Sequence, residues 1–368
     1  MIKNQIYTKT YFKKRSLNLL PCRSKYFMET INKKIELFLS KYLKTTFQIE
    51  KIEGSASDRI NYRISTQNQS YILTEGNNIT ENHSFFRFAE FFNTIGDFTP
   101  KILAINEDET LYLQEDVGKN SLLDYIKLHG ENDQTKELCK KCIKNLILMQ
   151  IKGKEGVDES WCYDFSQFDY LTAMHDLYYF KNYFLDLLSI AYSRKKLLQD
   201  FDLLAKKIDA IQPKSFMHRD FQSRNIMVKD NKISIIDFQG GMMGLPIYDL
   251  VSFSWQSRAN FSHSFKQELK QFYLDEFNQI SPQLMKKEEM EIQYELCLVI
   301  RLLQVLGAYG FRGIYQKKTQ FIESILQGVK NLNVFENLTI MQELPYLNEI
   351  GKKLTELSEN ELKTNIYA

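Results

Sequence analysis

The segment "HRDFQSRNIMVKDNKISIIDFQGG", residues 218–241, carries the polar side chains whose spacing is most readily tied to chemistry. Asp220 is followed by Asn225 after four intervening residues, and Asp237 lies twelve residues beyond Asn225. The residues between them read as two short strands joined by a turn at 229–232, which would return Asp237 to the side of Asn225. The spacing therefore predicts three oxygen-bearing side chains in one cleft.

This set of side chains suits phosphoryl transfer from a nucleotide. The acceptor hydroxyl needs a base that orients it, and oxygen ligands must hold Mg²⁺ against the phosphates. The HRD-x4-N spacing matches a kinase catalytic loop, with Asp220 as the base and with Asn225 and Asp237 sharing the metal. His218 is expected to brace the loop through hydrogen bonds. The competing interpretation is a polar hairpin in which Asp220 and Asp237 only cap turns.

The elements that must position this segment fall into two groups. Before Gly118, short β-type runs at 46–54, 60–66 and 70–76 precede a predicted helix at 81–94 and two more strands within 100–118. A further helix is predicted near 29–43. After Gly118 helical periodicity dominates, over residues 121–128, 133–150, 166–191, 195–210, 262–279, 286–306, 318–331 and 350–365. The sequence therefore predicts an α+β protein with a small antiparallel sheet and a large, mainly helical part.

The composition is that of a globular protein with a sizeable core. The chain has 368 residues, of which 43% are hydrophobic and 26% charged, with a formal net charge of +2. Bulk charge therefore favours neither a nucleic-acid nor a membrane partner. No uninterrupted apolar run approaches the ~20 residues of a membrane span. An odd number of cysteines, five, fits a reducing cytoplasm.

Two short features carry separate interpretations. Cys139 and Cys142 form a CxxC within helical periodicity and lack a second pair, so a helix with two partly buried thiols is favoured over a zinc site. Residues 1–28 contain seven Lys and Arg and no acidic residue. They lack the apolar run of a secretory signal. They are interpreted as a disordered extension from a start assigned too far upstream, with a peripheral arm as the alternative.

Five segments together resemble the aminoglycoside-phosphotransferase-like kinases, a branch of the protein-kinase-like superfamily. Within it they are most similar to the bacterial anomeric kinases of N-acetylmuramate and N-acetylglucosamine. The resemblance implies a bilobal fold with a nucleotide-binding lobe, a hinge, and a catalytic and substrate-binding lobe, at residues 29–114, 115–118 and 119–368. The segments are "GSASDRINYRI" (54–64), "YLQEDVG" (112–118), "HRDFQSRNIMV" (218–228), "IDFQGGMMGLPIYDLVS" (236–252) and "RLLQVLGAYGFRG" (301–313).

The resemblance also implies roles for individual residues. Asp220 would act on a sugar hydroxyl, Asn225 and Asp237 would bind Mg²⁺, and the donor would be ATP or GTP. Backbone groups of Glu115 and Val117 would contact the base. The remaining implied residues are Asp249, which would secure the catalytic loop from below, and Ser55 and Ser57, whose turn would cover the phosphates, although a plain hairpin turn fits them equally well.

One departure from the family pattern concerns the phosphate-binding lysine. Kinases carry it on the third strand, paired with a helix glutamate, but the corresponding strand here is "SYILTEG". Arg59 or Arg63 is the candidate replacement, with Glu81 or Glu90 as its partner. The alternative is that both arginines are surface residues of a strand, in which case activity would be slow or absent.

The acceptor site should contain a guanidinium if the sugar carries an acidic lactyl group, since an arginine fork matches a carboxylate. The implied function is kinase activity on the anomeric hydroxyl of an amino sugar, in cell-wall recycling. An aminoglycoside or amino-alcohol phosphotransferase and a catalytically silent nucleotide-binding regulator are the alternatives, and the oligomeric state is left open. The candidate arginines are Arg224, Arg258, Arg301 and Arg312.

Overall fold

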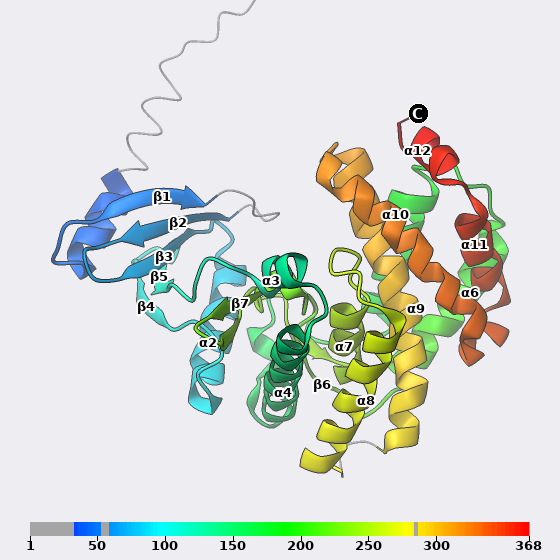
Figure 1. Cartoon of the computed structure of the whole chain (residues 1–368), viewed down its shortest axis with the longest axis horizontal. Coiled ribbons are helices and arrows are strands. Elements are labelled where there is room, and N and C mark those ends of the chain that lie inside the picture. The colour runs from blue at the N-terminus through cyan, green and yellow to red at the C-terminus, as the bar shows by residue number, and fades with distance from the viewer. Residues whose placement is uncertain (1–32, 53–58, 283–285, 368) are drawn as a thin grey trace, which may run out of the picture.

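A five-stranded antiparallel sheet forms the smaller of two lobes in the computed structural model, which describes residues 33–52, 59–282 and 286–367 (Figure 1). The strand order is β1-β2-β3-β5-β4. The strands are those that the alternating patterns predict, and residues 1–28 lie outside the described part of the chain. Their bounds are β1 (Gln48–Ile52), β2 (Ile60–Ser65), β3 (Ser70–Glu75), β4 (Ile102–Ile105) and β5 (Leu111–Glu115).

Helices cover both faces of this sheet. Along β5, Leu111 and Leu113 belong to the cluster formed with the helix at residues 33–42, whereas Tyr112 packs with Phe85 of α2 (Ile79–Ile95) at 5.3 Å between ring centroids. Successive strand residues face opposite sides, so this alternation places the two helices on opposite faces. The face covered by α2 is the one turned toward the second lobe (Figure 1).

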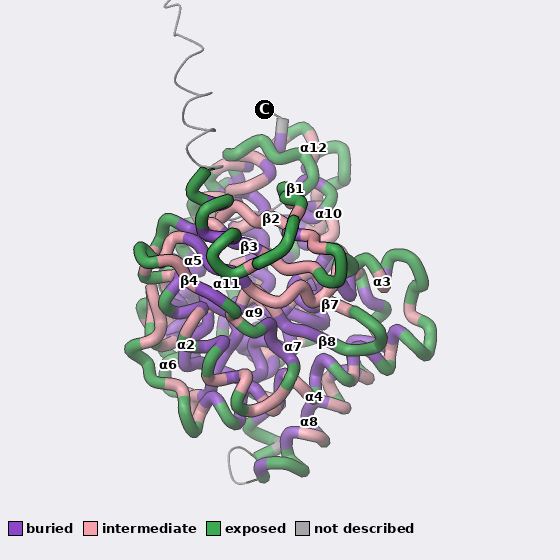
Figure 2. Tube along the Cα trace, turned by 90° about the vertical axis from the view of Figure 1, so that its left-hand side faces the viewer, coloured by how far each residue is buried: buried purple, intermediate pink, exposed green. Residues whose placement is uncertain are grey.

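The larger lobe is mainly helical and contains most of the buried core (Figure 2). The prediction of an α+β protein with a small sheet lobe and a large helical lobe is confirmed. The α-helices of the larger lobe are α3 (Leu122–His129), α4 (Asp133–Gly156), α5 (Tyr170–Phe180), α6 (Arg194–Asp209), α7 (Pro246–Ser254), α8 (His263–Ile280), α9 (Lys287–Tyr309), α10 (Ile322–Asn331), α11 (Pro345–Glu356) and α12 (Glu359–Tyr367).

Two helix predictions need correction, and one helix was missed. The helix expected over 166–191 begins only at Tyr170, because Asp169 caps it by accepting the Thr172 N–H, and it ends in a π-helical turn at Lys181–Leu185. The helix expected over 350–365 is two helices, α11 and α12. Helix α7 was not predicted. All nine of its residues are buried, so it lacks the one-sided apolar pattern that reveals a surface helix.

Four short strands position the catalytic segment. The hairpin of β7 (Ile226–Lys229) and β8 (Lys232–Ile235) matches the prediction, and its turn residues Asp230 and Asn231 both have positive φ, 51° and 59°. β6 (Ser215–Met217) pairs with β9 (Met242–Gly244). This second pair was not predicted, because three-residue strands carry too little alternation to be recognised.

Two features of the core differ from expectation. Cys139 and Cys142 are fully buried in α4 rather than partly buried. The helical stretch Glu288–Tyr315 is long and apolar enough to cross a membrane by length and composition, although 67% of its apolar window is buried within the protein. A core helix of a globular protein passes the same test, so this is weak support for a membrane span.

Gly307 marks a close crossing of α9 over α5 and gives a test of the packing. A Cβ atom there would lie 2.7 Å from the backbone nitrogen of Phe180. This distance is too short for two non-bonded atoms, and the backbone of a packed helix cannot easily move away. Gly307→Ala should lower the free energy of unfolding by about 1–3 kcal/mol. Gly240→Ala is the matched control, since no atom lies within 4 Å of its Cβ position. Equal denaturation midpoints for the two variants would contradict the close crossing.

Candidate active site

A buried carboxylate fixes the loop that carries Asp220. Asp249, in α7, accepts the backbone N–H of His218 at 2.7 Å and that of Arg219 at 3.0 Å. Burial raises the pKa of Asp249 to about 6, against these hydrogen bonds, which favour its ionised form. The Nε2 atom of His218 lies 3.0 Å from the Ile236 carbonyl. Asp249 and His218 thus lie beneath the loop and hold its backbone.

Arg219 anchors the same loop from the side. Its backbone has a φ of 76°, and its guanidinium donates to both oxygens of Asp176 at 2.8 and 2.7 Å. Burial opposes ionisation of Asp176, but the charge of Arg219 together with the hydrogen bonds from His175 and Arg219 lowers the pKa of that carboxyl. Asp176 was missed from the sequence, where the only signal is one acid among the apolar residues of a helix.

Asp220 and Asp237 line one cleft, and hydrogen bonds tie Asn225 to the backbone beside each of them. The Nδ2 atom of Asn225 donates to the Asp220 carbonyl at 2.9 Å, and the Asn225 carbonyl accepts the N–H of Ile236 at 3.0 Å. The second bond places Asp237 next to Asn225, at the end of the β7–β8 hairpin. Gln239 donates to Asp237 Oδ1 at 2.9 Å. Asp220 and Asp237 line the same small cavity.

Two arginines set the charge state of Asp220. Arg301 Nη2 lies 3.5 Å from Oδ1, and Arg224 Nη2 lies 3.9 Å from Oδ2. Burial favours the neutral form of this carboxyl, but the positive charges, that of Arg301 first, lower the pKa of Asp220 to about 2. Asp220 is therefore ionised at neutral pH, and it can accept a hydrogen bond from a hydroxyl group.

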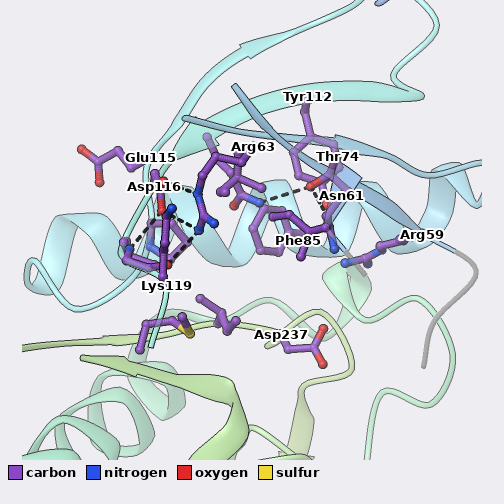
Figure 3. A pocket seen from close by; sticks show the side chains of 18 of the residues that line it. Arg59, Asn61, Arg63, Thr74, Phe85, Tyr112, Glu115, Asp116, Lys119 and Asp237 are labelled. Carbon is purple, nitrogen blue, oxygen red and sulfur yellow. Dashed lines mark hydrogen bonds and ion pairs between the residues drawn. The ribbon is translucent and has the colours of Figure 1, made fainter. Parts of the chain in front are cut away.

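A cavity of about 260 Å³ separates the sheet from the β7–β8 hairpin (Figure 3). Glu115 and Val117 both line it at the connection between the lobes. The Glu115 N–H already donates to the Lys101 carbonyl at 3.0 Å, whereas no hydrogen bond among the described residues involves the backbone of Val117. Of the two residues whose backbone was expected to contact a nucleotide base, only Val117 thus has both its N–H and its carbonyl available.

The two candidate phosphate-binding arginines lie at opposite ends of this cavity (Figure 3). Arg59 pairs with Glu81 of α2 at 2.8 Å, on the side of Asp237. Arg63 instead bonds Asp116 at 2.8 Å and the Gly118 carbonyl at 3.2 Å. The Arg63 guanidinium thus ties β2 to the connection between the lobes, and its role as the phosphate cation stays a prediction.

Three more of the expected residues are placed differently or lie beyond description. Glu90 pairs with the exposed Arg87 at 3.7 Å and not with either candidate arginine. Ser55 and Ser57 lie outside the described residues. Glu81 is thus the helix glutamate that pairs with a candidate cation.

A polar chain at the back of the cavity was not recognised in the sequence. Thr74 donates to Asn61 Oδ1 at 2.8 Å, and Gln114 donates to Thr74 Oγ1 at 3.3 Å. The Oε1 atom of Gln114 is buried and has no hydrogen-bond partner among the described residues. The sequence signal that could have revealed this chain is the alternation of side chains along each strand, which puts Asn61, Thr74 and Gln114 on the same face of the sheet.

A second cavity, of about 310 Å³, opens on the other side of Asp220. Two of the four candidate arginines, Arg301 and Arg224, lie against Asp220, as described above. The guanidinium carbons of Arg258 and Arg312 lie 5.2 and 5.6 Å from the ring centroid of Phe321. The fold thus brings together, around one cavity, four arginines that are far apart in the sequence.

Known proteins share parts of this sequence. An N-acetylmuramate/N-acetylglucosamine kinase of Neisseria meningitidis serogroup B is 27% identical over 157 residues, 42% of this chain and 45% of that protein. A kinase of the same name from Pseudomonas aeruginosa is 27% identical over 172 residues, 45% of this chain and 47% of that protein. The chain thus matches less than half of the length of either relative.

The fold and the sequence profile point to one family. A choline kinase from Cryptosporidium parvum superposes with a TM-score of 0.59 at 14% identity, covering 88% of this chain and 99% of that one, which confirms the kinase-like fold. The profile of the phosphotransferase enzyme family matches residues 48–282, more than half of the chain. The chain therefore belongs to the phosphotransferase enzyme family.

Proposed function

We propose that this chain is a small-molecule kinase that transfers a phosphoryl group from ATP, or GTP, to a hydroxyl of an amino sugar. The observation that carries the proposal is the convergence of Asp220, Asn225 and Asp237 between two cavities. Asp237 lines the cavity under the sheet, and Asp220 lines the arginine-rich cavity. A donor and an acceptor bound in these cavities would meet at the three side chains.

Asp220 would act on the acceptor hydroxyl. With a pKa of about 2, its carboxylate is a weak base and would first orient the hydroxyl through a hydrogen bond. It would receive the proton late, as the new O–P bond forms and the hydroxyl becomes acidic. The hydrogen bond from Asn225 to the Asp220 carbonyl keeps this residue aligned with the metal-binding pair.

Asn225 and Asp237 have the chemistry required for Mg²⁺. The amide nitrogen of Asn225 is used in the bond to Asp220, which leaves its oxygen for a metal, and Gln239 occupies only Oδ1 of Asp237. Among the described residues no group of three or more His, Cys, Asp or Glu could hold a metal alone. Mg²⁺ commonly completes its shell with substrate phosphates and waters, so two protein oxygens suffice. When bound, it would neutralise charge on the transferred phosphoryl group.

The remaining residues would hold the nucleotide. The backbone of Val117 would contact the base, and the Arg59 guanidinium, which pairs with Glu81, would contact phosphates at the Asp237 end of the cavity. This supports residues 29–114 as the nucleotide-binding lobe, 115–118 as the hinge and 119–368 as the catalytic and acceptor-binding lobe. The presence of all three catalytic side chains argues against a silent nucleotide-binding regulator.

The acceptor is proposed to be N-acetylmuramate or N-acetylglucosamine, phosphorylated at the anomeric hydroxyl. The names of the two relatives support the sugar, and the arginine-rich cavity suits an acidic one better than an aminoglycoside, whose ammonium groups it would repel. Such a product belongs to cell-wall recycling, and a cytoplasmic location is proposed with it.

The first test combines an acceptor panel with a change at Asp220. Purified protein with Mg-ATP should phosphorylate N-acetylmuramate or N-acetylglucosamine and leave kanamycin and choline unmodified. Asp220→Asn should lower kcat about 10²–10⁴-fold, since it removes the base, while ATP still binds. Asp230→Asn, at the tip of the β7–β8 hairpin, is the matched control and should keep full activity. Phosphorylation of kanamycin alone would refute the amino-sugar assignment.

The second test concerns the phosphate-binding cation. Arg59→Gln should raise the KM for ATP about 10–100-fold, the equivalent of ~1.5–3 kcal/mol for a lost charge-assisted hydrogen bond. Arg59→Lys should restore part of the loss. Arg87→Gln removes an exposed arginine of α2 and is the control. An unchanged KM in Arg59→Gln would show that another group holds the phosphates.

The third test is a pH profile. A depressed pKa means that Asp220 stays ionised down to about pH 2, so kcat/KM of the native protein should show no acid limb from this group above pH 4. Arg301→Gln removes the largest opposing charge, and the pKa of Asp220 should then move up toward or beyond its ordinary 3.8. Activity should consequently fall at a higher pH than in the native protein. Arg194→Gln, exposed on α6, is the control, and superimposable profiles would contradict this role of Arg301.

A further inference from the structure

The arginine-rich cavity has more positive charges than its own carboxylates can balance. Five arginines and two aspartates line it. Both oxygens of Asp176 accept hydrogen bonds from Arg219, and the carboxylate of Asp220 lies between Arg301 and Arg224. Neither Arg258 nor Arg312 has an acidic partner within ion-pair distance in residues 33–52, 59–282 and 286–367. Their guanidinium groups are the surplus charge.

The fold holds these two arginines firmly. Arg258 follows α7, and Arg312 lies in a π-helical turn, Gly310–Tyr315, that continues α9. A Cβ atom at Gly310 would collide with the Tyr183 carbonyl, so the glycine lets this turn pack directly against its neighbour. Wide turns of this kind are frequent at functional sites. Both guanidinium groups then rest on the nearly buried ring of Phe321.

Their surroundings penalise the uncompensated charge. Burial, and next the charge of Arg224, lowers the pKa of Arg312. Contact with an aromatic ring offsets part of this cost, but the N–H donors in the guanidinium plane have no acceptor in the part of the chain that the structure describes. An arrangement of donors held in this way is stabilised when an anion enters the cavity.

We propose that Arg258 and Arg312 form a subsite that binds a carboxylate carried by the acceptor molecule. The subsite is distinct from Arg301 and Arg224, which serve Asp220, and it makes the site selective for acidic acceptors over neutral ones. The identification of the ligand as an N-acetylated sugar acid rests on the proposed function. The inference that the ligand carries a carboxylate rests on the charges of the cavity. The nucleotide is a poor alternative source of the anion, because the cavity under the sheet shares no arginine with this one.

The test compares sugars that share the N-acetylglucosamine ring and differ in the group attached to it. N-acetylmuramate carries a carboxylate, N-acetylglucosamine is neutral, and N-acetylglucosamine 6-phosphate offers a phosphate instead. Arg258→Gln and Arg312→Gln should each raise the KM for N-acetylmuramate about 10–100-fold, as expected for a lost charge-assisted hydrogen bond. The change in kcat should be small, and the loss on the neutral sugar should be much smaller. Arg258→Lys and Arg312→Lys should each recover part of the affinity for N-acetylmuramate.

Lys318→Gln is the matched control. Its backbone N–H donates to the Arg312 carbonyl at 2.9 Å, but its exposed side chain does not line the cavity. It removes the same charge from the same region and should leave the ratio of kcat/KM for the two sugars unchanged. If Lys318→Gln shifted that ratio as much as Arg312→Gln does, the proposal would be overturned. The preference for the acidic sugar would then come from long-range electrostatic attraction and not from a subsite.

Calorimetric titration of each sugar, without nucleotide, keeps this proposal separable from the proposed function. If neither sugar is phosphorylated but N-acetylmuramate binds in a manner that requires Arg258 and Arg312, the subsite stands and the kinase assignment fails. The subsite proposal is overturned if the native protein binds the neutral sugar as tightly as the acid. It is also overturned if the phosphorylated sugar binds better than the carboxylate, or if N-acetylmuramate does not bind.

Discussion

The hydrogen bonds from the His218 and Arg219 N–H groups to the buried Asp249 are the interaction on which the site depends. They hold the loop in a shape that it would not adopt alone, since Arg219 has a φ of 76° and such a backbone costs about 1–3 kcal/mol. The fork between Arg219 and Asp176 opposes relaxation from the other side. The loop backbone at Asp220 is thus fixed by its neighbours in the chain, and the Asp220 carboxylate takes no part in holding that backbone.

Two hydrogen bonds of Asn225 join the two halves of the cleft. Asn225 donates from its side-chain amide to the Asp220 carbonyl and accepts the Ile236 N–H at its own carbonyl, so one residue sets the spacing between Asp220 and Asp237. The β7–β8 hairpin then transmits this spacing to Asp237. A change in the register of that hairpin by one residue would turn Asp237 away from the cleft, because successive strand residues face opposite sides.

Sequence reasoning succeeded where the structure is local. The hairpin and the convergence of Asp220 with Asp237 follow from spacing within 24 residues, and the sheet follows from alternation. It failed where the outcome depends on distant partners. The choice between Arg59 and Arg63 was open because their partners, Glu81 and Asp116, are selected by the tertiary packing of α2 and the hinge. The pairing of Arg219 with Asp176, and the gathering of Arg258 and Arg312 at Phe321, leave no pattern in the chain.

Arginine in place of lysine is a consistent choice on both sides of the cleft. In the cavity under the sheet, β3 presents Thr74, and the proposed phosphate cation is Arg59, which lies just before β2 and pairs with Glu81 of α2. A guanidinium can keep its bond to Glu81 and still direct other N–H groups at phosphate oxygens, which a single ammonium does less well. In the arginine-rich cavity the planar forks keep their charge when partly buried, and five arginines outnumber two aspartates, so the cavity stays positive. Under the proposed function, the two halves of the site would recognise oxyanions by the same physical means.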